Sequence, residues 1–259
     1  MAKVFVTTSW DDDHGSDLQL AEMLSAYGIR GTFYVPTGKL GTGSCLSTGD
    51  IRNLAVGGFE IGAHTVSHAI LPSLNHEELV REVGECKKVL QQILSAEVSM
   101  FCYPKGRFNS DVVNAVKNAG YRGARGARML SLGDTSEPFK IPVTVQAFPH
   151  SRTNYVRNLL RRGALRSLLR SSPELVHFRD WVHLGKIMFD RVLRHGGIWH
   201  LYGHSWEIQR RNLWPQLKDM LQYVSRRPDV TYITNGQILD CRAELAPYRR
   251  LAPSRTAGQ

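Results

Sequence analysis

Three adjacent carboxylates, Asp11, Asp12 and Asp13, follow directly after the apolar run at residues 4–10. This run holds β-branched and aromatic residues without Gly or Pro, which predicts a buried strand. Neighbouring carboxylates repel one another, so a fold that gathers them must compensate with a bound cation or a shared proton. An acidic turn or helix cap is the alternative that this stretch alone leaves open, because Asp is common at both.

Two histidines, His64 and His68, stand four residues apart at the end of a second apolar run, residues 59–64. On one helical face or in one tight loop, this spacing can bring two imidazoles to a single metal ion. A core or capping histidine is the competing interpretation of the pair taken alone. Beside the run that ends in Asp11 and Asp12, however, two imidazoles and one carboxylate would form an open divalent-cation site.

Two further turns end apolar runs. Residues 101–106, Phe-Cys-Tyr-Pro-Lys-Gly, enter a Pro-x-Gly turn that can aim a backbone N–H into a site as an oxyanion donor. His204 follows Gly203 at another strand end, where a histidine opposite an activated water can protonate a leaving group. We assign a structural role to His200, two residues earlier, and a core position to Cys102.

Strand-like and helical segments alternate along most of the chain, which predicts a parallel sheet with helices outside. The expected strands are residues 4–10, 31–36, 59–64, 99–104, 121–125, 140–148, 198–202 and 230–234, and the longer helices are 17–28, 75–94, 110–120 and 206–226. The fold class is therefore α/β, with a distorted (β/α) barrel of seven or eight strands as the best fit. Asp11, Asp12, His64, residues 104–106 and His204 all fall at strand ends, so we expect them on one face.

The 259 residues, 42% of them hydrophobic, suffice for one barrel domain, which we assign to residues 1–241. A basic helical insertion is expected at about 151–196 and a disordered basic tail at 242–259. No leader or bilayer-spanning run is visible, and four scattered cysteines fit a reducing compartment. We therefore expect a cytoplasmic protein.

The net charge of +10 is concentrated in residues 152–170 and 242–255. Leucines recur at helical spacing opposite arginines in residues 154–170, a pattern typical of helices at a membrane surface. Such a helix would allow contact with an anionic membrane or a lipid-linked substrate and a location peripheral to the inner membrane. A surface helix packed on the barrel by its leucines is the alternative. No nucleic-acid motif accompanies the charge, so specific nucleic-acid binding is not expected.

Taken in order, the segments Ser-Trp-Asp-Asp-Asp, His-Thr-Val-Ser-His, Phe-Cys-Tyr-Pro-Lys-Gly and Leu-Tyr-Gly-His resemble the polysaccharide deacetylase family, the NodB-homology enzymes of carbohydrate esterase family 4 type. The resemblance runs from residue 8 to about 239. It implies a distorted (β/α) barrel that uses a divalent metal to remove acetyl groups from sugars.

Position by position, the resemblance implies Asp11 as catalytic base, His204 as catalytic acid and the backbone N–H of Lys105 as oxyanion donor. It implies a metal site whose ligands are Asp12, His64 and His68. We expect the substrate pocket to include Tyr103, Pro104, Tyr202 and Trp206.

The chain departs from the family pattern at three places. Asp13 stands where the family usually has Gly, and Cys102 stands where many members have an Arg that tunes the catalytic Asp. Arg125 and Arg128 are both candidates to replace that Arg from the next strand. Tyr202 replaces a Leu and should reshape the acetyl pocket, with Trp206 as part of its apolar wall.

These observations predict a metal-dependent hydrolase that removes an N-acyl group, acetyl in the first instance, from a sugar. Lipid-linked and nucleotide-linked sugars are candidate substrates. Zinc is the expected metal, although cobalt, nickel or iron(II) also suits two imidazoles and a carboxylate. A non-catalytic carbohydrate-binding member of the fold and an amide hydrolase acting on a non-sugar are the alternatives.

Overall fold

The computed structural model describes residues 3–133, 136–151, 153–155 and 178–245. Its eight strands form one parallel sheet in the order β5-β4-β3-β2-β1-β7-β6, and β8 also pairs with β1. The sheet curls so that Arg125 of the edge strand β5 forms a parallel bridge with Ile141, in the segment that leads to β6 at the other edge. The predicted distorted barrel is therefore confirmed. The strands are β1 Val4–Asp11, β2 Gly31–Val35, β3 Glu60–Ala63, β4 Met100–Cys102, β5 Gly123–Arg125, β6 Val145–Gln146, β7 Gly197–Gly203 and β8 Val230–Tyr232.

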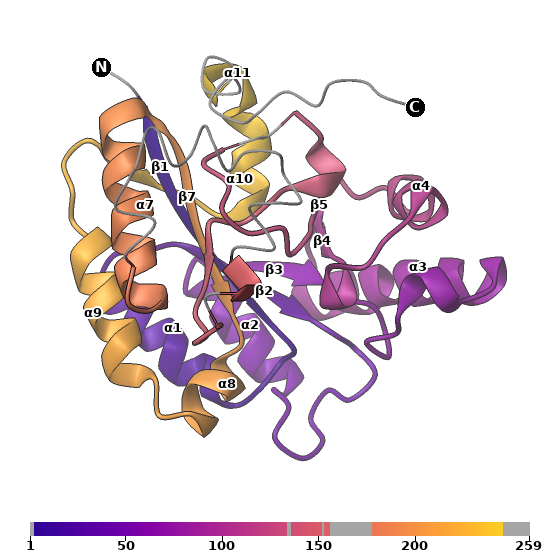
Figure 1. Cartoon of the computed structure of the whole chain (residues 1–259). Helices are drawn as coiled ribbons and strands as arrows, with labels where there is room; N and C mark the ends of the chain where they lie inside the picture. The colour runs from indigo at the N-terminus through magenta and orange to yellow at the C-terminus, as the bar shows by residue number, and fades with distance from the viewer. Residues whose placement is uncertain (1–2, 134–135, 152, 156–177, 246–259) are drawn as a thin grey trace.

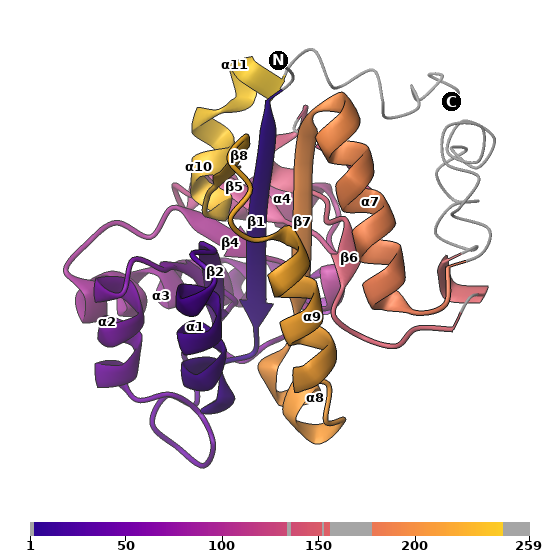
Figure 2. The ribbon, with the colours of Figure 1, turned by 90° about the vertical axis from the view of Figure 1, so that its left-hand side faces the viewer.

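β1 lies at the centre of the sheet, and all eight of its residues are buried. β7 pairs with it from Val4 to Trp10 along one edge. The other edge is shared, since β8 pairs with the first half and β2 with the second. Figure 2 shows β1 and β7 side by side in the middle of the molecule. Because every pair is parallel, the strands all end on the same side of the barrel, as the positions of the candidate residues require.

Helices surround the sheet, as Figure 1 shows. α3 begins with a capping box in which Asn75 and Glu78 bond each other's backbone N–H, and Asp180 caps α7 through the N–H of His183. The helices of the described chain are α1 Ser16–Ala26, α2 Thr48–Val56, α3 His76–Leu94, α4 Ser110–Asn118, α7 Trp181–His195, α8 Ser205–Arg210, α9 Trp214–Val224, α10 Asn235–Asp240 and α11 Arg242–Leu245, with short 3₁₀ turns at η1 Leu71–Ser73, η2 Pro104–Gly106 and η3 Pro138–Lys140.

Three boundaries predicted from the sequence are wrong. The strand expected at 140–148 is reduced to β6, Val145–Gln146, because Lys140 belongs to the 3₁₀ turn η3 and Pro142 has no backbone N–H for a sheet ladder. The helix expected at 206–226 is divided into α8 and α9, because Asn212 adopts a positive φ of 53° and Pro215 starts a new first turn. The tail expected from residue 242 begins later, since residues 242–245 form α11 and Leu245 is fully buried. An ion pair of 2.5 Å between Lys3 and Glu244 ties α11 to the start of β1. Residues 246–259 lie outside the described residues.

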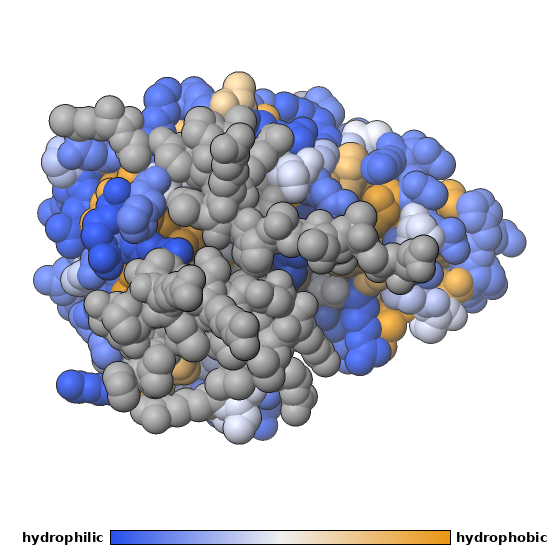
Figure 3. Space-filling model, turned by 45° about the horizontal axis from the view of Figure 1, so that its top comes forward, coloured by the Kyte–Doolittle hydropathy of each residue, from blue (hydrophilic) through white to orange (hydrophobic). Residues whose placement is uncertain are grey.

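The predicted insertion at 151–196 contains α7, which packs against α9 and β7 as part of the helical layer. Most of the basic segment at 154–170 lies outside the described residues. Among the coloured residues of Figure 3, hydrophilic ones predominate and apolar ones appear as separate patches. Among the described helices, none has both the length and the apolar character needed to cross a membrane.

Candidate metal and catalytic site

Asp12, His64 and His68 converge at the carboxyl ends of β1 and β3. Asp12 Oδ1 lies 3.5 Å from Nε2 of His64 and 3.2 Å from Nε2 of His68. The chain turns sharply to bring them there, with a φ of 83° at Asp12 and 59° at His68. Positive φ is uncommon outside Gly, although Asp and His tolerate it better than most residues. The predicted ligands are therefore together in space.

The protons on these three side chains are arranged as a cation site requires. Nδ1 of His64 lies 2.8 Å from the carbonyl oxygen of Cys102 and must donate to it, which leaves the Nε2 lone pair facing Asp12. Asp12 Oδ1 is buried without a hydrogen-bond partner among the described residues. An orphaned carboxylate oxygen beside imidazole lone pairs fits a divalent ion.

Asp11 and Arg125 form a buried ion pair beside this site. One guanidinium nitrogen of Arg125 donates to both carboxylate oxygens of Asp11, and Arg125 also lies over the rings of Tyr34 and Tyr202, 5.2 and 4.9 Å from their centres. Burial raises the pKa of Asp11, but Arg125 together with the charges of His64 and His204 outweighs burial, and the net shift is downward. Arg125 is thus the one of the two candidate arginines that is seen to contact Asp11.

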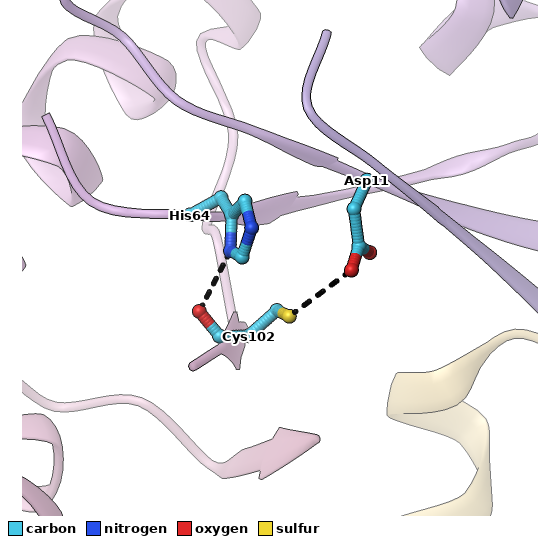
Figure 4. A group of neighbouring side chains, drawn as sticks. All are labelled: Asp11, His64 and Cys102. Atoms are coloured by element: carbon cyan, nitrogen blue, oxygen red, sulfur yellow. Dashed lines mark hydrogen bonds between the residues drawn. The ribbon is translucent and has the colours of Figure 1, made fainter. Parts of the chain in front are cut away.

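Cys102 completes the surroundings of Asp11. Its Sγ lies 3.6 Å from Asp11 Oδ2, and Figure 4 shows Asp11, His64 and Cys102 facing one another. These three could also offer metal ligands, with the ligand atoms within 4.8 Å of one another. Arg125 already binds both oxygens of Asp11, however, so the set that includes Asp12 and His68 fits a cation better.

His204 faces the metal site from the end of β7. Its Nδ1 lies 2.6 Å from Glu207 Oε2, and its Nε2 lies 3.6 Å from Asp12 Oδ2. Burial lowers the pKa of His204, but the hydrogen bond with Glu207 and the charges of Asp11 and Asp12 outweigh burial and raise it. The indole N–H of Trp206 donates to Asp12 Oδ2 over 3.1 Å. His204 can therefore present a proton on Nε2 towards the site.

The remaining predicted residues lie nearby in different settings. Lys105 is exposed and has a φ of 54° in the turn after the buried Pro104. Tyr103 is fully buried and donates its hydroxyl to the carbonyl of Phe139, which places it in the barrel wall. Tyr202 is also buried, and its hydroxyl donates to Gln146 Oε1 over 2.6 Å. None of these contacts tests the expected pocket directly.

Sequence reasoning missed Glu207 and Glu82. Glu82 lies on α3 and is buried, and its carboxylate accepts the backbone N–H groups of Val66 and Ser67 at 2.9 and 2.8 Å. It also accepts the Ser67 hydroxyl at 2.7 Å, so it anchors the loop between His64 and His68. The sequence signal that could have identified Glu82 is its position as a charged residue on the apolar face of the helix at 75–94.

The extra carboxylate of Asp13 turns away from the cation site. Its Oδ1 accepts the backbone N–H of Leu46 over 3.0 Å, and burial raises its pKa to about 6. His200 lies deeper in the barrel, where its Nε2 is 2.8 Å from Ser9 Oγ. Burial lowers the pKa of His200 to about 3, so this histidine is neutral, as a structural role requires.

Three comparisons bear on this site. Residues 2–124 match the family model for polysaccharide deacetylases. A protein of Bacillus subtilis (strain 168), YxkH, whose name describes it as a candidate polysaccharide deacetylase, is 25% identical over 134 residues. The match covers 51% of this chain and 45% of YxkH, so the chain matches less than half the length of this curated relative.

Solved structures with the same fold cover almost the whole chain. A candidate polysaccharide deacetylase from Mycobacterium smegmatis has a TM-score of 0.63 at 16% identity, over 100% of this chain and 94% of its own. A family 4 acetyl xylan esterase from Clostridium thermocellum, in complex with a cobalt ion, has a TM-score of 0.59 at 14% identity, over 92% of each chain. At these identities the similarity is one of fold.

Proposed function

Since this chain belongs to the polysaccharide deacetylase family, which its residues 2–124 match, we propose that it is a metal-dependent hydrolase that removes an N-acyl group from a sugar. Acetyl is the first candidate for the acyl group. The observation that carries the proposal is the convergence of a three-ligand cation site with an ionised Asp11 and a proton-bearing His204. Three protein ligands leave coordination positions open, as a catalytic metal requires.

Asp12 Oδ1 and the Nε2 atoms of His64 and His68 would hold the cation. When bound, the metal supplies a Lewis acid that polarises the acyl carbonyl and makes a bound water more acidic. We propose zinc for this position, with cobalt, nickel or iron(II) as substitutes because two imidazoles and a carboxylate accept each of them.

Asp11 then acts as general base and takes a proton from the attacking water. It is ready to do so because Arg125 keeps its carboxylate ionised inside the barrel. The oxyanion that develops on the acyl group would receive the backbone N–H of Lys105. His204, oriented through Nδ1 by Glu207, donates its Nε2 proton to the departing amine.

The opposite pKa shifts of Asp11 and His204 give each residue the protonation state that its role needs at the same pH. Arg125 lowers the pKa of Asp11 and Glu207 raises that of His204, so a base without a proton and an acid with one coexist near neutrality. Burial alone would shift both groups the other way.

We further propose that the sugar carries a phosphate or lipid-phosphate group, in the cytoplasm or at the inner face of a membrane. The support is the net charge of +10, which attracts anionic partners. The substrate pocket we propose is lined by Tyr202 and Trp206, with Tyr103 and Pro104 as the wall behind it.

Release of carboxylic acid from a panel of N-acetylated and N-formylated sugars, nucleotide sugars and lipid-linked sugars tests the proposal. We expect release that needs zinc or cobalt and is abolished by Asp11→Asn and by His64→Ala. Stoichiometric metal and sugar binding without release would instead support a carbohydrate-binding member of the fold. Release from simple amides but from no sugar would favour the non-sugar hydrolase.

A further inference from the structure

Trp206 contacts the candidate metal ligand Asp12 through the oxygen that does not face His64 and His68. The indole N–H donates to Oδ2 over 3.1 Å, whereas Oδ1 points to His64 and His68. Resting on the proposed function, we propose that Trp206 is a positioning residue that holds Asp12 as a ligand through Oδ1 alone. This role of the indole N–H is additional to the place in the pocket wall that we propose for the ring of Trp206.

The carboxylate of Asp12 needs such a partner because packing does not fix it. Its side chain is 24% exposed, and the terminal torsion of an Asp is broad and nearly two-fold. The side chain also follows a backbone turn at a φ of 83°, outside the strand. A directed hydrogen bond to one oxygen restricts the rotation and leaves the other oxygen for the cation. Partners behind a ligand tune metal affinity in this way.

A second donor competes for the same oxygen. Nε2 of the candidate acid His204 lies 3.6 Å from Asp12 Oδ2. Without the indole N–H, Oδ2 would be satisfied by His204 alone, which would draw the acid towards a ligand and away from the leaving group. Trp206 therefore also separates the two tasks of Asp12 and His204.

The backbone around Trp206 is held by contacts that do not involve the indole. Ser205 is fully buried and its Oγ accepts the Ser16 hydroxyl over 2.7 Å, which joins the start of α8 to the start of α1. On the C-terminal side of Trp206, the carboxylate of Glu207 forms a hydrogen bond with His204. A Trp206→Phe substitution keeps a ring of similar character and removes the N–H, so the turn should retain its course.

The test measures cobalt and zinc binding to the full chain by competition with a chelator. We expect Trp206→Phe to lower the affinity for both metals about 10–100-fold, which is the usual effect of losing a hydrogen-bond partner behind a metal ligand. The visible bands of the cobalt-loaded protein should change as well, because they report ligand geometry. The melting temperature without metal should stay at the wild-type value.

Trp214→Phe is the matched control, because the indole of Trp214 also donates to a side-chain oxygen, Gln209 Oε1 at 2.7 Å, on an exposed part of the surface. Wild-type affinity and cobalt spectrum in Trp206→Phe would overturn the proposal. His64→Ala distinguishes the proposed metal site from the proposed role of Trp206. If this variant bound metal like the wild type, the metal site itself would be refuted. In the unmodified chain, the indole N–H resonance of Trp206 should shift on addition of zinc, and an unshifted resonance would overturn the proposal without any variant.

Discussion

Replacing Arg125 with Met gives the sharpest test of how this site is built. Arg125 is 1% exposed, and its guanidinium contacts both oxygens of the equally buried Asp11. Met retains most of the apolar stem of Arg125 and removes only the charge and its hydrogen bonds. The substitution therefore leaves a carboxylate inside the barrel without its counter-ion.

The cost follows from this burial. Removing one partner of a buried ion pair destabilises a protein by about 3–5 kcal/mol. For a chain of this size, at about 2–4 °C per kcal/mol, the loss lowers the melting temperature by roughly 6–20 °C. Surface pairs contribute far less, about 0–1 kcal/mol. Chemical unfolding of the metal-free protein at pH 7 measures the difference.

The pH dependence carries a distinct signature. In the wild type the folded pKa of Asp11 lies below its unfolded value, so its stabilisation is present above the unfolded pKa and is lost as the pH falls through the folded pKa. In Arg125→Met only the charges of His64 and His204 still oppose burial, so the folded pKa of Asp11 rises relative to the wild type. The stability deficit of the variant should therefore be largest near neutrality and shrink as the pH falls through the folded pKa of Asp11 in the variant and then through that of the wild type, which lies below about 4. The acid limb of kcat/KM should move to higher pH, because Asp11 must be ionised to act as base.

Arg122→Met is the control, three residues away. Its ion pair with Asp240 is exposed, with side chains 50% and 56% accessible, so the variant should unfold within about 1 kcal/mol of the wild type. If Arg125→Met behaved like Arg122→Met in unfolding and kept the wild-type pH profile, the assignment of Arg125 as the residue that ionises Asp11 would be refuted.

Three further substitutions probe separate parts of the structure. Glu207→Gln removes the charge that raises the pKa of His204, so the alkaline limb of kcat should shift to lower pH, and an unmoved limb would exclude Glu207 from this role. Glu82→Gln weakens the hydrogen bonds that hold the 64–68 loop, so the free energy of unfolding should decrease by about 1.5–3 kcal/mol in a denaturant titration. The affinity for zinc should decrease about 10–100-fold in a zinc titration. His200 is neutral in the fold, with a pKa of about 3, whereas the unfolded chain takes up its proton below about pH 6.5. The free energy of unfolding should therefore decrease as the pH falls from about 6.5 to about 3, by up to about 1.4 kcal/mol per pH unit. Denaturant titrations of His200→Gln should show a flatter dependence on pH.

The barrel could be predicted from the sequence because its signals are local. Strand-forming runs such as residues 4–10 end in Gly, Pro or Asp, and amphipathic helices such as α3 begin at recognisable caps. The rule that parallel strands end on one face then predicts that Asp12, His64 and His204 lie together. Among the errors, those at α8–α9 and at α11 arise where one Asn with positive φ and one buried Leu decide the course of the chain.

The partners of the site residues could not be predicted in the same way, because they are set by the curl of the sheet. Arg125 and Arg128 were equal candidates along the chain, and only the placement of β5 at the closing edge of the barrel directs the first of them at Asp11. A guanidinium delivered from β5 frees the β4 position for Cys102, whose small side chain then leaves room for Arg125 between Tyr34 and Tyr202. The departure at Cys102 and the buried Arg125 are thus two parts of one arrangement, in which the charge that tunes the base comes from the neighbouring strand.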